Sequence, residues 1–528
     1  MEDKTIFSKS FLSLRKNLGL TQEKIAGMLG VSRQAVQKWE NGTSMPDAEK
    51  LIEIAGVFDV SLDYLIRGKD NRSTEELRTK REMLPSFNLH PWEAYYKEMP
   101  TEYQQTFEEG KDVEKYKNLM YAIAGMPDGK AKSDMADIIF GIIEELPQRA
   151  DYKYEEPSDL EGIFNCSRRK NHVYIRQSAK VLEDRIKGAW YGRICGCLLG
   201  KSIEGIRRSE LIPFLKATGN YPMKRYITKS DAENTGDLKI GFPIAQRAYP
   251  DGIMDGMPVD DDTNYIMMAY LLVKQYGKDF TPADDARHWL WNQPKDAYCT
   301  AERVAFRNFV NGYYPPDSAS YKNPYREWIG AQIRGDFFGW INPGRPEKAA
   351  EMAWKDGCIS HIKNCIYGEM WVSAMLAAAA GGASAGDSIR IGMEYIPEKS
   401  RLFEALEKVL DFYGSGKTSD EFFEDFHKRW DDCNGHHWCH TISNAEIVAA
   451  SLLWGEGDYG KSVCLAVQQG FDTDCNGATV GSVVGIANGF SSIPSVWTDK
   501  ISGTLFTTIF NHEKVSVNEM AKKTMELI

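Results

Sequence analysis

The sequence predicts an all-α protein with three parts: a small N-terminal domain over residues 1–68, a helical connector over 69–167 and a large domain over 168–528. The chain has 528 residues, enough for about three domains at roughly 150 residues each. Residues 1–68 carry short apolar stripes at helical spacing, preceded by residues that can cap helix N-termini. From residue 168 onward, helical patterns alternate with Gly, Pro and Asp turns, and few segments show the alternation of a strand.

Composition excludes several classes of protein. Hydrophobic residues make up 42% and charged residues 26% of the chain, which supports a folded core and not a disordered chain. The net charge is −11, so binding to nucleic acid would have to be carried by one local module. The most apolar stretch, 371–386, is too short to cross a bilayer, which takes about 20 apolar residues. With no secretory signal at the N-terminus and ten cysteines in ordinary usage, we expect a cytoplasmic protein without disulfides or membrane contact.

The first 68 residues predict short helices separated by tight turns. The first helix carries Leu12, Leu14 and Leu18, and Thr21 and Ser32 are suited to cap the two helices that follow. The helix after Ser32 has a buried face and a polar face. These faces hold Ala35, Val36 and Trp39 on the buried side, and Arg33, Gln34, Gln37 and Lys38 on the other.

A specific motif runs through this domain. Its strings are Thr21-Gln22-Glu23-Lys24-Ile25-Ala26, Gly30-Val31-Ser32, Val36-Gln37-Lys38-Trp39-Glu40-Asn41-Gly42 with Pro46, and Ser61-Leu62-Asp63-Tyr64-Leu65. The pattern resembles the lambda-repressor-like (Cro/C1, or XRE) helix-turn-helix family, whose domain has five helices. The resemblance covers nearly all of residues 1–68.

That resemblance implies binding to duplex DNA. In this family the second helix of the motif enters the major groove, which places Arg33, Gln34, Gln37 and Lys38 near base edges and Gln22 and Ser32 near phosphates. The alternative is a charged helix face that is only solvated. Up to Asp70 the segment holds ten basic and ten acidic residues. One monomer should therefore bind DNA weakly, and we expect a homodimer.

The connector differs in composition, being charged and aromatic. Residues 70–80 predict a polar linker, and residues 133–146 an amphipathic helix. Its stripe either packs within a small helical connector, which we favour, or forms a subunit interface. The stripe consists of Met135, Ile138, Ile139, Ile142, Ile143 and Leu146.

Two acidic motifs precede helical patterns in the large domain. The motifs are Val259-Asp260-Asp261-Asp262-Thr263 and Gly470-Phe471-Asp472-Thr473-Asp474-Cys475-Asn476. Adjacent carboxylates repel one another, and burying them costs several kcal/mol unless positive charge compensates. A helix N-terminus compensates in part, and a divalent cation does so better, because Mg²⁺, Mn²⁺ and Ca²⁺ select oxygen ligands. The carboxylates suffice for two ions. Alternatively, both motifs are exposed helix caps.

A helix with glycine at every fourth position comes earlier in the chain. Gly188, Gly192, Gly196 and Gly200 line one face and permit a second helix to approach closely, although each glycine costs the helix about 1 kcal/mol. We therefore expect this helix to be central. Cys195 and Cys197 are interpreted as packing residues, and Glu204 follows at the end of the helix.

The order of these elements resembles the ADP-ribosylglycohydrolase family, from about Ile186 to Trp497. The family is all-α and uses a binuclear magnesium or manganese site to cleave the bond at C1 of ADP-ribose. The resemblance implies metal ligands at Asp261, Asp262, Asp472 and Asp474, with Glu204 beside them and His361 lining the ligand cleft. Either Asp262 or Glu204 would then handle the proton during cleavage.

Two positions depart from that family's pattern. Asp260 stands where a threonine usually precedes the paired aspartates, and Cys475 where a threonine or serine usually follows the last one. A thiol is a poor ligand for a hard cation, and the extra charge of Asp260 would offset its loss. We therefore include Asp260 and Cys475 in the expected metal-binding set. We expect this set to hold two Mg²⁺ ions, with Mn²⁺ as the alternative metal.

Histidines and cysteines crowd residues 433–440, which invites comparison with zinc sites. Structural zinc normally draws on two separated ligand pairs, and no second pair matches this one. We favour a surface or cleft loop in which His440 faces the substrate. His361 is either a ligand-contacting residue or a satisfied core histidine.

Together these patterns predict a metal-dependent hydrolase acting on an ADP-ribosylated or ADP-ribose-like substrate, fused to a sequence-specific DNA-binding module. The alternative is a transcriptional regulator whose large domain binds an ADP-ribosyl or nucleotide ligand without cleaving it. Asp260 and Cys475 favour the alternative, and retention of the other carboxylates favours the enzyme.

Overall fold

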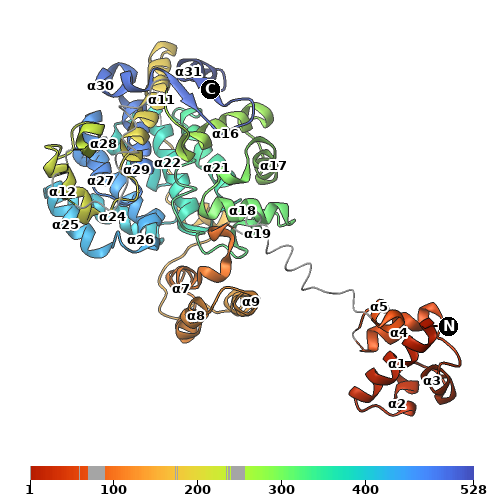
Figure 1. Ribbon diagram of the computed structural model, residues 1–528. Coiled ribbons are helices and arrows are strands. Elements are labelled where there is room, and N and C mark those ends of the chain that lie inside the picture. Colours follow the sequence, from red (N-terminus) through yellow and green to blue (C-terminus); the bar gives the residue numbers. More distant parts are fainter. Residues whose placement is uncertain are drawn as a thin grey trace. The chain divides into compact units, whose positions relative to one another are not determined.

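The computed structural model describes residues 2–58, 60–68, 90–172, 174, 177–233, 235, 238 and 256–528. The chain divides into two compact units, Met1–His90 and Pro91–Ile528 (Figure 1). The predicted all-α class is confirmed, because the described ranges hold one small sheet beside many helices. That sheet is a hairpin of β1 (Thr504–Phe506) and β2 (Lys514–Ser516), antiparallel with Leu505 opposite Val515. None of the helices described is both long and apolar enough to cross a membrane.

The N-terminal unit holds the five helices that its motif implies. The hydroxyls of Thr21 and Ser32 accept hydrogen bonds from backbone N–H groups three residues on, at 3.1 and 3.2 Å, so both predicted caps are confirmed. Ser61 caps the last helix in the same way. The five are α1 (Glu2–Asn17), α2 (Gln22–Met28), α3 (Arg33–Glu40), α4 (Ala48–Phe58) and α5 (Leu62–Arg67).

Aromatic and aliphatic side chains together form the core of this unit. Phe7 and Phe11 of α1 are buried, and the ring of Phe11 meets that of Trp39 edge-on with centroids 6.0 Å apart. Leu18, which the sequence places on the first helix, follows the end of α1 and is 58% exposed. The buried face of α1 therefore lies nearer its N-terminus than the leucine spacing predicts.

The second unit contains the connector and the large domain. The connector elements are η2 (Pro91–Glu93), η3 (Tyr95–Lys97), α7 (Met99–Glu108), η4 (Glu114–Tyr116), α8 (Lys117–Ala124), α9 (Lys130–Glu144) and α10 (Leu160–Asn165). The large domain begins with α11 (Ala179–Lys201), α12 (Arg208–Ala217), α13 (Lys229–Glu233), α16 (Asp261–Tyr276), α17 (Pro282–Asn292), η5 (Lys295–Ala297), α18 (Thr300–Val310), α19 (Asp317–Ser320), α20 (Asp336–Trp340) and α21 (Pro346–Gly357). It continues with α22 (Lys363–Ala380), α23 (Ala385–Met393), α24 (Arg401–Gly414), α25 (Ser419–Arg429), α26 (Gly435–Cys439), α27 (Thr441–Gly455), α28 (Tyr459–Val467), α29 (Thr473–Asn488), η6 (Phe490–Ser492), α30 (Ser495–Thr498), η7 (Asp499–Ile501) and α31 (Val517–Met525).

The large domain is built around one helix pair, α11 and α29. The glycines at every fourth position of α11 face α29, whose own glycines face back, as the spacing predicts. A Cβ atom on Gly192 would stand 2.1 Å from the carbonyl oxygen of Gly481, and one on Gly196 would stand 2.0 Å from that of Gly477. Neither helix has room for a side chain here, so the two backbones are in direct contact.

The same pairing aligns the ends of the two helices. A Cβ atom on Gly200 would stand 2.2 Å from the carbonyl oxygen of Thr473, and the Thr473 hydroxyl donates a hydrogen bond to the Gly200 carbonyl at 2.9 Å. The C-terminus of α11 therefore lies beside the N-terminus of α29. Lys201 and the acidic motif at 472–474 are brought together as a result.

The connector covers its own apolar stripe. Ile139 and Ile143 of α9 are buried in a cluster with Met120 of α8 and Tyr95 of η3, as favoured from the sequence. Ile138, also on the predicted stripe, is 58% exposed. The predicted linker at 70–80 lies outside the described residues.

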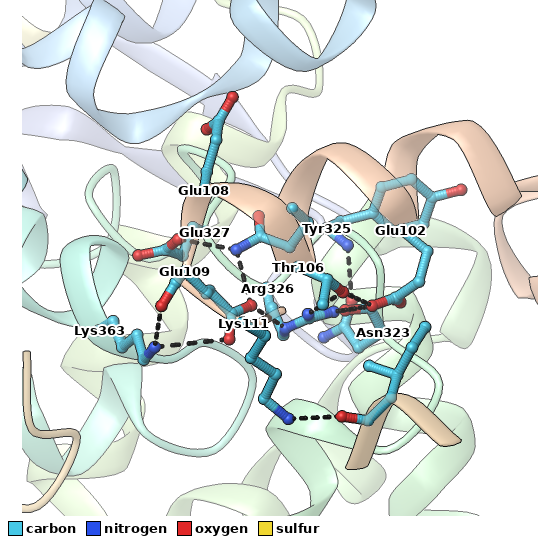
Figure 2. Close-up of polar contacts among 12 residues, drawn as sticks. Glu102, Thr106, Glu108, Glu109, Lys111, Asn323, Tyr325, Arg326, Glu327 and Lys363 are labelled. Atoms are coloured by element: carbon cyan, nitrogen blue, oxygen red, sulfur yellow. Dashed lines mark hydrogen bonds and ion pairs between the residues drawn. The ribbon is translucent and has the colours of Figure 1, made fainter. Parts of the chain in front are cut away.

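Helix α7 attaches the connector to the large domain through buried charges (Figure 2). Glu102 and Glu109 pair with the Arg326 guanidinium group at 2.9 and 2.5 Å. Gln105 donates a hydrogen bond to a carboxylate oxygen of Glu327 at 2.7 Å. Separating these groups would leave buried charges unpaired, which costs several kcal/mol. The connector and large domain accordingly fall in one compact unit.

The glycine contact predicts an unusual response to alanine. In an exposed helix, Gly→Ala stabilises by about 1 kcal/mol. Gly192→Ala should instead lower the melting temperature of the large domain, because the added methyl group meets the Gly481 backbone, and overpacking of this kind costs about 1–3 kcal/mol or more. Differential scanning calorimetry of the full chain measures the effect.

Gly141→Ala is the matched control. Gly141 is an exposed helix-interior glycine of α9 with no atom within 4 Å of its Cβ position. Its replacement should leave the melting temperature unchanged or raise it. Equal responses of the two variants would contradict the packing argument.

Candidate functional site

A cavity of about 570 Å³ lies where the C-terminal end of α11 meets the N-terminal ends of α16 and α29. Its wall combines carboxylates with aromatic rings. The acidic and basic residues are Glu204, Asp260, Asp261, Asp296, Glu302, Asp472, Asp474 and Lys201, and the tryptophans are Trp92, Trp328 and Trp438. The structure therefore brings together most of the acidic residues that the sequence singles out.

Asp260 is fully engaged by protein groups. It caps α16, where one carboxylate oxygen accepts a hydrogen bond from the Asp262 backbone N–H at 2.9 Å. The other oxygen lies 2.7 Å from the Lys201 ammonium group. Burial opposes ionisation, but Lys201 lowers the pKa of Asp260, so the pair is charged. Each oxygen of Asp260 thus already has one protein partner, and the role of Asp260 as a metal ligand stays a prediction.

Asp262 lies behind the cavity wall. Its side chain is fully buried, and the Arg193 guanidinium group approaches it at 2.9 Å while also pairing with Asp336 at 3.0 Å. Arg193 donates a further hydrogen bond to the Asp262 carbonyl oxygen at 3.0 Å. Asp262 therefore anchors α16 to α11, and its position argues against the predicted proton-transfer role.

Three further carboxylates have no partner cation within the part of the chain that the structure describes. Burial and the charges of Asp260 and Asp474 raise the pKa of Asp261 to about 7. Burial and mutual repulsion raise the pKa values of Asp472 and Asp474 well above the ordinary range. One oxygen of Asp474 is buried and receives no hydrogen bond from the described residues. The chain thus concentrates negative charge that it leaves incompletely compensated, which is the donor chemistry of a hard-cation site.

Cys475 lies within the same group. Its thiol, Asp262 and Asp474 each place a ligand atom within 4.8 Å of the others. Burial and the nearby carboxylates raise the pKa of Cys475 well above its usual value. The residue is therefore a neutral thiol, which makes it a weaker ligand than the other predicted members.

The two predicted substrate-binding histidines lie away from the cavity wall. His361 is fully buried, with its Nδ1 atom 2.8 Å from the Ser360 hydroxyl, and burial lowers its pKa well below the usual value. His440 is also fully buried and caps α27 by accepting a hydrogen bond from the Ile442 N–H at 3.1 Å. Both therefore occupy core positions and neither lines this cavity, while their contact with a ligand stays a prediction.

A cluster of Glu108, His436 and His440 has the spacing of a metal site but the wrong protonation. Their candidate ligand atoms lie within 4.8 Å of one another. The Nδ1 atoms of both histidines already accept hydrogen bonds, from Trp328 in one case and a backbone N–H in the other. In the neutral rings Nε2 then carries the proton and cannot ligate a metal. The cluster serves instead as a hydrogen-bonded contact between α7 and the large domain.

Sequence reasoning missed the basic residues of the site. Arg193, Cys197 and Lys201 are four residues apart, so they share one face of α11 and meet α16 together. That spacing was the available signal. Sequence reasoning also missed Trp92, because this residue lies in the connector and not in the large domain.

The predicted DNA-binding residues form an exposed surface of the N-terminal unit. Arg33, Gln34, Gln37 and Lys38 are exposed on α3, while Val36 and Trp39 are buried. Ser32 is exposed at the start of this helix. Gln22 is half-buried and its amide donates a hydrogen bond to Glu40 at 2.7 Å, which fixes its orientation beside α3.

Comparisons with known proteins match two separate parts of the chain. Residues 178–527 match the family model described as ADP-ribosylglycohydrolase, and residues 12–65 match one described as Helix-turn-helix. A solved structure described as an ADP-ribosylglycohydrolase-related protein complex is 17% identical, with a TM-score of 0.39, and covers 66% of this chain and 98% of that chain.

Curated relatives match a short part of the chain. An uncharacterized HTH-type transcriptional regulator, YqaE of Bacillus subtilis (strain 168), is 38% identical over 76 residues, 14% of this chain and 66% of that protein. The HTH-type transcriptional activator BcrR of Enterococcus faecalis is 34% identical over 82 residues, 16% of this chain and 40% of that protein. Repressor protein C2 of Salmonella phage P22 is 30% identical over 78 residues, 15% of this chain and 36% of that protein. The chain spans less than two thirds of the length of each.

The carboxylate cluster predicts a stability that depends on both pH and divalent cations. A raised pKa means that Asp261 stabilises the fold when protonated and that this contribution is lost as pH rises through about 7. A bound cation would offset the loss, because it binds the deprotonated form. The increase in melting temperature produced by Mg²⁺ should therefore be larger at about pH 8 than at about pH 5, as measured by calorimetry with and without EDTA.

Asp474→Asn tests whether the cluster is responsible. The amide cannot ionise, so the variant should lose most of the Mg²⁺ response, while Asp279→Asn, which changes a carboxylate with 91% of its side chain exposed, should keep it. A Mg²⁺ response that is absent in the unmodified protein, or identical in the two variants, would contradict the assignment.

Proposed function

Because the chain belongs to the ADP-ribosylglycohydrolase family, we propose that its large domain is a metal-dependent hydrolase. The reaction would cleave the glycosidic bond at C1 of an ADP-ribosyl or related ribosyl group. The observation that carries the proposal is the convergence of Asp261, Asp472 and Asp474 on one cavity with no partnering side-chain cation among the described residues. These residues would hold Mg²⁺ or Mn²⁺.

The cation would supply positive charge that orients the ribose hydroxyls and acidifies water. Two ions are expected from the sequence, but Lys201 and Arg193 already pair with Asp260 and Asp262. Asp261, Asp472 and Asp474, which do not compete with a protein cation for their charge, are therefore best suited to binding one metal ion.

Glu204 is the proposed proton-transfer residue. It lies in the cavity wall, and its charge is among the causes that raise the pKa values of Asp472 and Asp474. A carboxylate beside the reacting sugar can protonate a leaving group or deprotonate water. Asp262, fully buried and paired with Arg193, acts instead as a positioning residue.

A second candidate function follows from the same ion pairs. With Asp260 and Asp262 compensated by protein cations and Cys475 a neutral thiol, the site has fewer metal donors than its motif implies. This favours a domain that binds an ADP-ribosyl or nucleotide ligand without cleaving it. Product formation separates the two functions.

Catalysis predicts release of ADP-ribose. The full chain with Mg²⁺ and an ADP-ribosylated peptide should produce free ADP-ribose, detected by liquid chromatography. Glu204→Gln should lower kcat by roughly 10²- to 10⁴-fold, the usual loss on removing a general acid or base. Asp279→Asn serves as the control and should retain full activity. Ligand binding without any product would support the sensing domain instead.

The N-terminal unit is proposed to bind duplex DNA as a homodimer. Its support is the exposed polar face of α3, held by the caps at Thr21 and Ser32, together with the helix-turn-helix match. Two copies would read half-sites about one helical turn apart. Joined to a ribosyl hydrolase or sensor, such a module implies a role in transcription.

Base and phosphate contacts give different mutational signatures. Gln34→Ala or Gln37→Ala should relax base preference in a selection from random duplex DNA. Lys38→Gln should weaken all sequences alike and reduce the slope of log affinity against log salt by about 1. Lys9→Gln, an exposed lysine of α1, is the charge-matched control. Failure to enrich any sequence would argue that this face of α3 is only solvated.

A further inference from the structure

We infer that Trp92, a connector residue, is a substrate-binding residue of the large domain's cavity. With Trp328 and Trp438 it would form an aromatic recess that takes a planar heteroaromatic ring of the substrate. The family match begins at residue 178, yet Trp92 lies in the wall of the cavity that holds the carboxylates. This inference rests on the proposed function, since it names a second group of the ribosyl substrate.

Buried ion pairs hold the Trp92 segment in place. Glu93, the next residue, is 4% exposed and pairs with Lys295 at 2.8 Å and with Arg303 at 3.6 Å. The Glu93 carbonyl oxygen accepts a hydrogen bond from Arg307 at 2.9 Å. Lys295 is followed by Asp296, which lies in the cavity wall. The contact thus anchors η2 beside the cavity.

Trp92 packs against the same small cluster of buried residues as Trp328. It lies on a small cluster with Ala301, Val304, Tyr325 and Trp328, in which the rings of Tyr325 and Trp328 are 4.7 Å apart. The Trp328 indole N–H donates to His436 at 3.0 Å, which fixes the plane of that ring.

Trp438 is the third tryptophan of the recess, and its indole N–H can donate a hydrogen bond to a ligand. The Arg207 guanidinium group lies over its ring, 5.4 Å from the centroid. Its indole N–H is buried and donates to no acceptor among the described residues. Heteroaromatic rings carry acceptor nitrogens or carbonyl oxygens, which a buried N–H can serve.

The ion pairs between α7 and the large domain hold the segments that carry Trp92 and Trp328 in place. Arg326 and Glu327 immediately precede Trp328 in the chain, and both are tied to α7 of the connector (Figure 2). Moving the connector away would expose or unpair those charges. Trp92 and Trp328 are therefore fixed relative to each other before any ligand arrives, which lowers the entropic cost of stacking.

A ribosyl substrate has two possible sources of such a ring. One is the adenine base of an ADP-ribosyl group, and the other is an aromatic leaving group on C1. Stacking on an indole is indifferent to which ring it meets, because both present a π-face. Three probes distinguish them: ADP-ribose carries adenine, nicotinamide riboside carries an aromatic leaving group, and ribose 5-phosphate carries no ring.

The test measures binding of these probes to the full chain with Mg²⁺ by titration calorimetry. Trp92→Ala should weaken at least one ring-bearing probe by roughly 5- to 150-fold, the range for loss of one stacking partner. Binding of ribose 5-phosphate should not change. Trp92→Phe should restore part of the affinity. Trp291→Ala, which removes an indole that is 76% exposed on α17, should change nothing.

The outcomes separate this inference from the proposed function. Weakened ADP-ribose alone identifies adenine, and weakened nicotinamide riboside alone identifies the leaving group. The inference is overturned if no ring-bearing probe binds the unmodified protein, if Trp92→Ala leaves their affinity unchanged, or if it weakens ribose 5-phosphate equally. Stacking on Trp92 in a protein that forms no product would sustain the recess and reject the hydrolase.

Discussion

The direct contact between the backbones of α11 and α29 is the constraint on which the rest of the large domain depends. Because no side chain fits between Gly192 and Gly481, the two helices have one register, and that register sets Gly200 beside Thr473. The acidic motif of α29 consequently meets the end of α11, which bears Lys201 and is followed by Glu204. A one-turn slip would move these groups about 5 Å apart along the axes.

Charge balance is the second constraint, and α11 supplies it. Arg193 and Lys201 lie two turns apart on one face and neutralise one carboxylate each at the start of α16. Burial and the charges of neighbouring carboxylates, Glu204 among them, raise the pKa values of Asp472 and Asp474. One helix therefore provides both the close packing and the division between compensated and uncompensated carboxylates.

The sequence predicted what depends on local pattern and missed what depends on distant partners. The glycine spacing predicted the central helix. The Asp-rich strings before apolar runs predicted two helix N-termini, which meet at the cavity. The burial of His361 could not be predicted, because a buried histidine beside a serine has the same local sequence as one that lines a cleft. The ion pair of Asp260 could not be predicted either, because its partner Lys201 lies far away in the chain. Leu18 shows the same limit at the scale of one helix, since apolar spacing does not reveal where a helix ends.

The anchored connector also separates two meanings of the word domain. A fragment cut at residue 178 would retain the carboxylates of both acidic motifs and every glycine of the α11–α29 contact. It would lack the carboxylates that pair with Arg326, the Gln105 amide that bonds to Glu327, and one side of the cavity. The segment that matches the family is thus smaller than the folded unit that forms the cavity. A modular exchange of DNA-binding heads would have to make its junction upstream of η2 to preserve the cavity.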